Sequence, residues 1–592
     1  MTGDPPGPPG APGAADALDE LDASLAMHDD LIARRGVEIW IGAEPTFTRA
    51  DSIDPAWTSA AAGDDKLARA HAVAVALGDR LPGAAVSRVI GRQFPDETEA
   101  RFAFGVRWRD GSSGPDPGAP GAAGSRCAAD AMPEPPPEDP GGDRWLTVTP
   151  DPGVVEVNMA PCASVRSFAH QARRIWDAAR VAGLSAIRHR FNGDPGDAGG
   201  GGQLSLGGPR PEHSPFVRYP HVLPALIRYV NNHPSLSYWF ANECVGSASQ
   251  GPRPDEGARE RYDELGVTLG WLEQLADRGE LLPDRLWAAL GSLLVDSSGN
   301  SHRAELNVEK LWNPHIAAHG PRHGRMGIVE LRAIRMPDRP AMLTALAVLF
   351  RSIVARLAVS DYRAPLIDWH DELHDRFALP AALSRDLRLV LGDLDEHGLG
   401  VPAQLRGELS AWRTPGIVGQ LGDAALTLRP ALEFWPLVGD VASQERAGTR
   451  VVDASTQRWE ISIDGPGPDR VVVSTGGDAP LAPRWAHLHA LGDGVRAIGV
   501  RRRVYPPAVG FHPGLPATDP LVVEWAWAGR AQRIELWAWR PGGGPYPGLP
   551  FDEADAIARR QERITVVTHD DELTATGRWP AQRPFTIDLR TA

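Results

Sequence analysis

The stretch GIVELRAIRMP, residues 327–337, decides how we interpret the fold. Side chains alternate between the two faces of a β-strand, so Glu330 and Arg332 share one face while Val329 and Leu331 occupy the other. One face therefore suits a hydrophobic core, and the other carries a carboxylate beside a guanidinium. A single strand of this kind is equally well explained as a structural ion pair at a sheet edge, because charged groups are rarely buried without a partner.

The same arrangement recurs in three further segments, PGVVEVNMAP, NSHRAELNVEKLW and VEIWIGAEPTFT. Each places a glutamate on a polar strand face: Glu156 with Asn158, Glu305 with Arg303 and Asn307, and Glu44 at the end of its strand. Four carboxylates on one sheet would repel one another and raise one another's pKa, so cations must compensate them. Arg303, Arg332 and Lys310 supply part of this charge, and Mg²⁺ or Mn²⁺ is the usual remainder.

Length and charge limit the class of protein. The chain has 592 residues, which corresponds to about two to four domains, and its net charge of −15 gives no support for a nucleic-acid partner. Arginine greatly outnumbers lysine, since Lys66 and Lys310 are the only lysines. Arginine-rich stretches are therefore weak indications of a binding site in this chain.

Three widely spaced cysteines, Cys127, Cys162 and Cys244, favour a reducing compartment over a disulfide framework. None of them forms a CxxC pair, so a thiolate zinc site is not expected. The N-terminus lacks a signal-peptide pattern, and no uncharged apolar stretch approaches membrane-spanning length. We expect a cytoplasmic protein without a membrane partner.

Composition and periodicity predict an α+β protein with a largely antiparallel sheet, because the strands alternate polar and apolar residues whereas parallel strands tend to be apolar on both faces. The expected order is a tail and helix (1–35), the sheet domain (36–345) with a low-complexity loop (111–143), a helical segment (346–436), and a β-sandwich-like domain (437–592). The loop is rich in proline and glycine, so we expect it to be removable without loss of stability.

Four consecutive glycines, Gly199 to Gly202, precede a predicted strand. Glycine allows backbone N–H groups to approach a phosphate closely, but the run matches neither GxxxxGK[ST] nor GxGxxG. A flexible hairpin connection and a nucleotide-binding loop both remain open from the residues alone.

Taken together, these segments resemble a family of bacterial amidoligases that have a glutamine-synthetase-like fold and usually follow a transglutaminase-like domain. The resemblance extends from about residue 36 to 570, and it is carried by WIGAEPTF, FPDETEARFAFGVRWR, TPDPGVVEVNMAP, the glycine run, NNHPSLSYWF, GSASQGPRPDE, LLVDSSGNSHRAELNVEKLWNP, GIVELRAIRMP, VVDASTQRWEISIDG and RVYPPAVGFHP.

This resemblance implies an ATP-dependent carboxylate–amine ligase, in which ATP phosphorylates a carboxylate and an amine displaces phosphate. It implies an antiparallel glutamine-synthetase-like sheet with flanking helices, and Mg²⁺ or Mn²⁺ held by Glu44, Glu156, Glu305 and Glu330. Arg332, Arg303 and Lys310 would act on the phosphoryl group. Nucleotide contacts are expected from Gly200, Gly201, Gln203, Asn158 and His302.

The sequence departs from the family pattern in three places. Members usually carry Asn-His after the glycines, where Gly202 and Gln203 stand here, and the loop at 111–143 replaces a longer segment with strands. The transglutaminase-like domain is absent. These changes favour an alternative reading as a catalytically degenerate homologue that serves as a binding or assembly subunit, with protein partners of the amidoligase or transglutaminase type.

A third class, a glycoside hydrolase with paired carboxylates, also accounts for glutamates on one face. Arginine two positions away suits phosphate better than sugar, because the guanidinium binds phosphate through two parallel hydrogen bonds. The ligase reading therefore predicts a small-molecule or peptide carboxylate and an amine as substrates.

Overall fold

In the computed structural model of the protein, the residues described are 14–49, 57, 61–81, 83–92, 101–109, 143–151, 153–198, 201–313, 324–413, 416–440, 450–468, 470–477, 479–505, 510–570, 573–580 and 583–591. The predicted loop at 111–143 lies outside these ranges apart from Asp143, and so does Gly200.

Two antiparallel sheets meet at the short connection, Glu44 and Pro45, that joins a strand of one sheet to a strand of the other. One sheet has the order β3 (Ala85–Arg92), β4 (Arg101–Arg109), β5 (Asp143–Asp151), β6 (Val154–Asn158), β2 (Thr46–Arg49) and β7 (Leu184–Ser185). The other has the order β1 (Trp40–Ala43), β10 (Leu204–Gly207), β12 (Val329–Leu331) and β11 (Leu306–Asn307). Residues 44 and 45 connect β1 to β2, and the Met159 N–H donates to the Ala43 carbonyl at 2.9 Å, so the two sheets are continuous.

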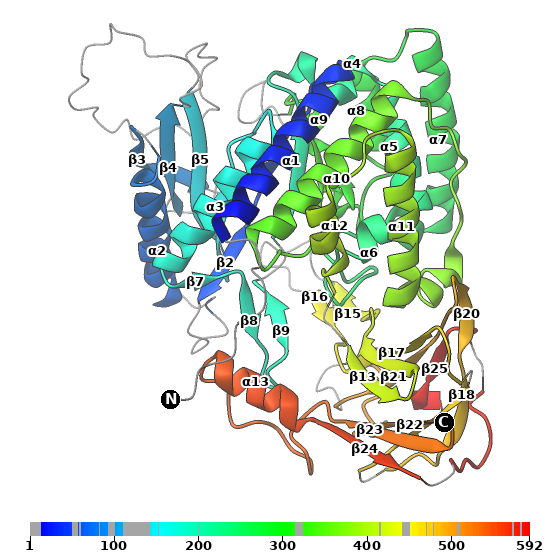
Figure 1. The fold of residues 1–592 in the computed structure, drawn as a ribbon. Helices are drawn as coiled ribbons and strands as arrows, with labels where there is room; N and C mark the ends of the chain where they lie inside the picture. The colour runs from blue at the N-terminus through cyan, green and yellow to red at the C-terminus, as the bar shows by residue number, and fades with distance from the viewer. Residues whose placement is uncertain are drawn as a thin grey trace, which may run out of the picture.

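Helices cover one face of this surface. α2 (Ala61–Gly78) packs on β4 and β5, and α3 (Val165–Val181) packs on β1, α1 (Ala14–Arg34), α2 and α10 (Pro340–Val359). Figure 1 shows α1, α3 and α10 running side by side. Val148, Val155 and Val157 point to this face and are fully buried. Apolar side chains at alternate positions thus form the core, and the intervening polar side chains lie on the opposite face.

α10 is long and apolar enough to cross a membrane by length and composition, but 89% of its most apolar 18-residue window is buried within the protein. It begins with Pro340 at its first turn, where the missing N–H costs nothing, and it packs on α3, α5 (Val222–Asn232) and α12 (Ala403–Ser410). It is therefore the central helix of the main core.

The remaining helices surround α10 and the polar sheet face. They are α4 (Pro215–Arg218), α6 (Ser235–Tyr238), α7 (Arg259–Asp277), α8 (Pro283–Leu290), α9 (Glu309–Trp312) and α11 (Pro380–Glu396). A small hairpin, β8 (Ile187–His189) and β9 (Pro195–Asp197), extends toward the C-terminal region.

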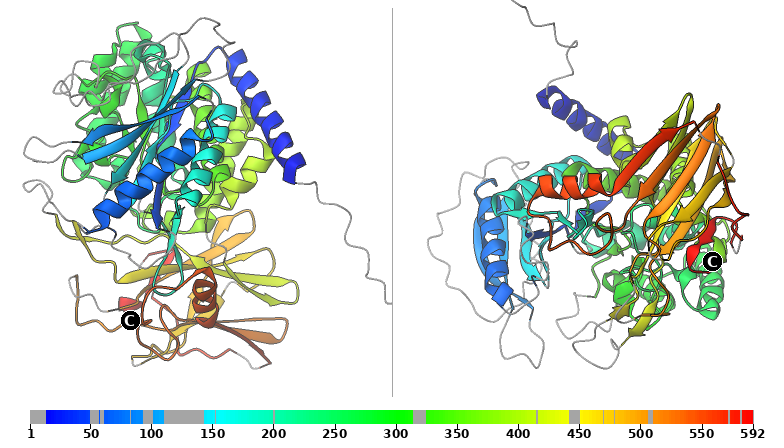
Figure 2. Two further views of the ribbon diagram at one scale, coloured as in Figure 1. Left: turned by 90° about the vertical axis from the view of Figure 1, so that its left-hand side faces the viewer. Right: turned by 90° about the horizontal axis from the view of Figure 1, so that it is seen from below.

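The C-terminal region has its own hydrophobic core between two sheets. The first sheet contains β13 (Ile417–Leu421), β14 (Ala424–Pro430), β17 (Thr456–Asp464), β21 (Val495–Arg503) and β20 (His489–Gly492), with β25 (Thr586–Asp588) parallel to β21. The second contains β19 (Arg484–His487), β18 (Arg470–Thr475), β22 (Leu521–Trp527), β23 (Arg530–Leu536) and β24 (Ile564–His569). β15 (Leu437–Asp440) pairs with β16 (Arg450–Val452), and α13 (Glu553–Glu562) lies beside the β8–β9 hairpin (Figure 2).

Three sequence expectations need correction. The predicted boundary at 345/346 falls inside α10, whose side chains share one core with the sheet. The predicted helical segment does not extend to 436, because residues 417–430 form β13 and β14, joined through Gly422 at a φ of +60° and paired with β17. Arg303 belongs to a 3₁₀ turn, Ser301–Arg303, and not to a strand, since Asn300 caps that turn and β11 has only two residues.

The register of β4 and β5 provides a test of the predicted loop. Arg109 and Asp143 are direct partners, so an Asn-Gly turn can replace residues 110–142 without changing either strand. Shortening a closed loop this much lowers its entropy cost by about 2 kcal/mol, so we expect the free energy of unfolding in denaturant to be unchanged or up to about that much higher. A Gly/Ser segment of the original length is the matched control. A loss above about 2 kcal/mol in both variants would show that the native segment packs against the protein.

Candidate active site

The polar face of the joined sheets brings several predicted residues together. Thr46 pairs with Glu156, and Ser205 and Asn307 both pair with Glu330. Directly opposed residues in antiparallel strands share a face. Five strands therefore present their polar side chains on the face opposite α2 and α3.

At the centre of this face lies a group that we call the charged cluster, formed by Glu44, Gln203, Lys310, Glu330 and Arg332. The Arg332 guanidinium donates to the Glu330 carboxylate and, at 3.2 Å, to the Gln203 side-chain oxygen. The Lys310 ammonium lies 3.5 Å from Glu44 and 3.4 Å from Glu330. The Glu330 side chain is only 2% exposed. Each of its two carboxylate oxygens therefore contacts a different cation, Arg332 at one oxygen and Lys310 at the other.

Glu156 lies beside the charged cluster, on the strand next to Glu44. Its carboxylate accepts a hydrogen bond from the Asn158 amide at 3.0 Å. Burial and then repulsion from Glu44 and Asp151 raise its pKa to about 8. Burial also raises the pKa of Glu44, against the attraction of Lys310. The negative charge of these two carboxylates is thus less well compensated than that of Glu330.

Glu305 is separate from the charged cluster, although the Arg332 N–H donates to its backbone carbonyl at 2.9 Å. Its buried carboxylate instead accepts from the Ser237 hydroxyl and lies 3.7 Å from the Arg253 guanidinium. Burial raises the pKa of Glu305 to about 7. Arg253 is also buried and pairs with Asp255 at 2.9 Å, so Glu305 belongs to a neighbouring ion-pair network that sequence reasoning missed. Ser237 lies in the motif HPSLSYWF, and Arg253 and Asp255 lie in GPRPDE. The unusual composition of these two motifs was the only signal of this network in the sequence.

Gly201 and Gly202, the part of the glycine run that the structure describes, are used for close packing. A side chain on Gly201 would meet the Thr46 side chain at 2.2 Å, and one on Gly202 would meet the Arg335 carbonyl at 2.0 Å. These glycines therefore let the chain cross the polar face directly before Gln203. Two predicted residues are not members of the charged cluster. His302 is exposed and pairs with Glu309 at 3.2 Å. Arg303 belongs to the same 3₁₀ turn as His302, Ser301–Arg303, before β11.

Two cavities flank the charged cluster. The first, about 220 Å³, is lined by Glu44, Lys310 and Asn158. The second, about 340 Å³, is lined by Arg332 and Arg335 among others, and Ser237 lies on its wall. Because Lys310 and Arg332 both contact Glu330, the charged cluster forms the boundary between these cavities. The first carries one carboxylate and one ammonium group, from Glu44 and Lys310. The second, which we call the basic cavity, carries three arginines and one carboxylate: Arg188, Arg332, Arg335 and Asp197.

Within the part of the chain that the structure describes, no three His, Cys, Asp or Glu side chains are arranged to hold a metal ion. Glu44 and Glu156 nevertheless fit Mg²⁺ or Mn²⁺, because these ions are often held by one or two carboxylates, with water and substrate phosphate completing the shell. Burial, together with repulsion from neighbouring carboxylates, raises the pKa of both, and a bound cation would offset that repulsion. The expected four-glutamate site is therefore reduced to these two, with Glu330 paired to Arg332 and Lys310.

The pKa of Glu156 predicts a pH effect on stability. Between the ordinary pKa of 4.5 and about 8, the folded protein holds a proton that the unfolded chain releases, so this group makes stability fall as the pH rises through that window. A Glu156→Gln substitution removes the effect. From pH 5 to pH 8 we expect its free energy of unfolding to gain about 3 kcal/mol relative to the parent. Denaturant unfolding at both pH values measures the difference, with the exposed Glu280→Gln as control; parallel pH curves for the parent and Glu156→Gln would contradict the raised pKa.

Comparison with known proteins assigns the chain to a family. No curated protein and no solved structure matches it significantly. The family described as "Putative amidoligase enzyme (DUF2126)" matches residues 12–114 and 132–590, which is most of the chain and includes every residue of the charged cluster. The chain therefore belongs to this amidoligase family.

Proposed function

We propose that the protein is an ATP-dependent carboxylate–amine ligase whose reaction takes place at the charged cluster. The observation that carries the proposal is the position of Lys310, Glu330 and Arg332 between two cavities, one lined by Glu44 and Lys310 and the other rich in arginine. A ligase of this type must hold a metal–nucleotide on one side of the transferring phosphoryl group and a carboxylate on the other. The polar antiparallel sheet backed by helices also agrees with the glutamine-synthetase-like fold that the resemblance implies.

In this proposal Glu44, on the wall of the first cavity, and the neighbouring Glu156 hold Mg²⁺ or Mn²⁺, assisted by the Asn158 amide. The bound ion would neutralise charge on the phosphate oxygens. Lys310 and Arg332 would contact the transferring phosphoryl group, because both are already directed at the boundary between the cavities. The buried Nε of Arg332 has no hydrogen-bond partner among the described residues, so part of the guanidinium is available to a ligand.

The basic cavity would bind the carboxylate substrate. Arg335 lines it, and burial lowers the pKa of this guanidinium. A buried arginine of this kind favours an anionic ligand, and Asn242 on the same wall offers an amide. The substrate is therefore a small-molecule or peptide carboxylate whose reactive group lies next to Arg332.

The proposed chemistry has two steps. A carboxylate oxygen of the substrate attacks the γ-phosphorus of ATP, the bond to the ADP oxygen breaks, and an acyl phosphate forms. The amine nitrogen then attacks the acyl carbon, phosphate leaves, and the nitrogen gives up one proton. Arg332 and Lys310 would stabilise the negative charge on the phosphoryl oxygens in both steps.

A second candidate is a binding or assembly subunit of the same family. The observation that favours it is the internal pairing of Glu330, whose charge Arg332 and Lys310 already satisfy without a ligand. In that case the charged cluster would stabilise the sheet and the protein would act through partners, for which a cytoplasmic setting is proposed.

Isotope transfer distinguishes these functions. With ATP, Mg²⁺, hydroxylamine and a panel of amino acids labelled with ¹⁸O in their carboxylates, the ligase should release ADP and transfer ¹⁸O to phosphate. An Arg332→Lys substitution keeps the charge but loses the planar fork, so turnover should fall about 10²-fold while the melting temperature stays near that of the parent. Arg385→Lys is the control, because the Arg385 side chain lies on α11, is 43% exposed and pairs with Asp493.

Two results would contradict the ligase proposal. A lowered melting temperature with full turnover in Arg332→Lys would show that Arg332 stabilises the fold and does not act on the phosphoryl group. Absence of ADP release in the parent across the panel would favour the binding subunit.

A further inference from the structure

A third cavity, next to the basic cavity, lies where the helical body meets the C-terminal sheets. Its volume is about 280 Å³, and we call it the arginine cavity because Arg458, Arg501, Arg583 and Arg590 line it. It shares no lining residue with either cavity at the charged cluster. The segment 452–454 divides it from the basic cavity, since Asp453 faces the arginine cavity while Val452 and Ala454 line the other.

Two of the four arginines are neutralised by nearby carboxylates. Arg501 lies 2.9 Å from Glu433, and Arg590 donates two hydrogen bonds to Asp588, at 2.9 and 2.6 Å. The remaining acid on the wall, Asp453, is already used: its carboxylate accepts from the Ser455 backbone and hydroxyl and from the Phe511 N–H. These neutral donors orient the Asp453 carboxylate, whose negative charge remains on this wall of the cavity.

Arg458 is the most buried of the four, with 2% of its side chain exposed. Its closest carboxylate, Glu433, is 3.8 Å away, beyond hydrogen-bond distance, and its guanidinium donates instead to the His374 carbonyl at 2.9 Å. Its Nε is buried without a hydrogen-bond partner in the described part of the chain. Burial lowers the pKa of Arg458 to about 10. A cation held this deep without a close carboxylate is costly unless an anion completes the site.

Arg583 supplies a second guanidinium that, like Arg458, has only a distant carboxylate partner. It is 45% exposed, donates to the same His374 carbonyl at 3.4 Å, and lies 4.0 Å from the exposed Asp371. Two guanidinium groups from distant parts of the chain thus converge on one carbonyl. Arginine forks match the oxygens of a tetrahedral phosphoryl group, which accepts several hydrogen bonds at once.

Aromatic rings form the wall next to these arginines. The His374 and Phe434 rings are stacked with centroids 3.5 Å apart, and the Arg458 guanidinium lies 5.5 Å from the Phe434 centroid. Phe511 is another ring on this wall. The cavity therefore offers both an anion site and an apolar surface for a substituent attached to the anion.

We propose that the arginine cavity binds a phosphoryl group, as free phosphate or as a phosphate monoester whose substituent packs against Phe434. Arg458 and Arg583 provide the charge. Arg501 and Arg590 also line the site, but each is paired with a carboxylate. This site does not depend on the ligase chemistry proposed for the charged cluster.

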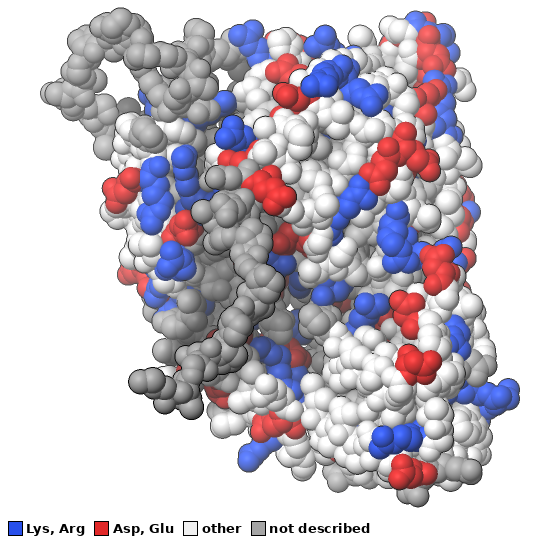
Figure 3. Space-filling view, in the orientation of Figure 1, with Lys and Arg blue, Asp and Glu red and all other residues white. Residues whose placement is uncertain are grey.

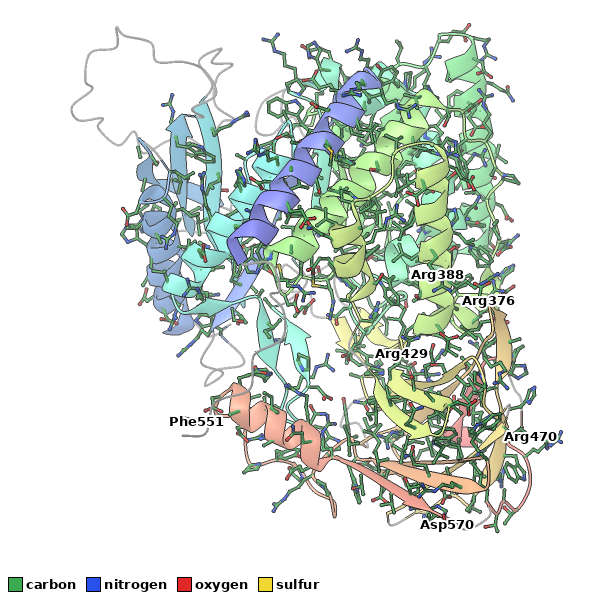
Figure 4. The ribbon with its side chains drawn as sticks, in the orientation of Figure 1. Arg376, Arg388, Arg429, Arg470, Phe551 and Asp570 are labelled. Carbon is green, nitrogen blue, oxygen red and sulfur yellow. The ribbon has the colours of Figure 1, made fainter. Side chains whose placement is uncertain are left out.

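Calorimetric titration of the full chain with inorganic phosphate and with phenyl phosphate tests the proposal. Arg458→Gln is a poor probe because a change at so buried a site can unfold the protein, so Arg583→Gln is used. We expect saturable binding in the parent and about tenfold weaker binding in Arg583→Gln, the scale of one lost hydrogen bond to a charged group. Arg388→Gln, on α11 (Figure 4), removes an exposed arginine elsewhere and should leave the affinity unchanged.

Lys310→Met separates this cavity from the charged cluster, and its phosphate affinity at the arginine cavity should equal that of the parent. Tighter binding of phenyl phosphate than of phosphate identifies a monoester ligand, and equal binding identifies free phosphate; both support the phosphoryl site. Absence of saturable binding by either probe in the parent would overturn the proposal. So would complete loss of binding in Lys310→Met at an unchanged melting temperature, or equal affinities in Arg583→Gln and Arg388→Gln with both variants folded.

Discussion

The burial of Glu330 between Arg332 and Lys310 is the interaction on which the polar sheet face depends. β12 is three residues long, yet it pairs with β10 on one side and β11 on the other, so the Glu330 carboxylate lies on an inner strand of its sheet. Arg332 directly follows this strand, and Lys310 comes from α9. Loss of one partner of a buried ion pair typically costs about 3–5 kcal/mol, because the remaining charge stays buried. The ion pair therefore fixes the boundary between the two cavities as firmly as the apolar core fixes the opposite face.

Alternation along a strand was enough to predict which side chains share this face. Glu156 and Glu330 are on the predicted polar side because a period of two leaves only one choice once Val155 and Val329 are buried. Glu44 and Arg332 lie just beyond the ends of their strands and join the same cluster through their contacts with Lys310 and Glu330. The same reasoning was wrong for Arg303. There the Asp296 carboxylate accepts the N–H groups of Ser298 and Asn300, at 2.8 and 2.9 Å, and this turn ends the polar alternation before β11.

Other features depended on tertiary contacts that a pattern does not contain. Glu305 has the predicted parity, but its charge is drawn to Arg253, which comes from a loop some fifty positions earlier in the chain. The β13–β14 hairpin had a local signal, Gly422–Asp423 between two apolar runs, which was overlooked beside the strongly helical neighbouring segment. The arginine cavity could not be predicted, because its residues come from β17, β21 and the end of the chain and the arginine-rich composition hides them. Basic and acidic side chains are interspersed over the face drawn in Figure 3, so the concentrations of one sign described here arise from burial and not from the surface as a whole.

The central claim, that the charged cluster holds a metal–nucleotide between its two cavities, is tested most directly by a crystal structure with Mn²⁺ and a non-hydrolysable ATP analogue. We predict an anomalous manganese peak within coordination distance of Glu44 and Glu156, with the terminal phosphate in contact with Lys310 and Arg332. A nucleotide bound elsewhere, or manganese bound without either glutamate, would contradict the account.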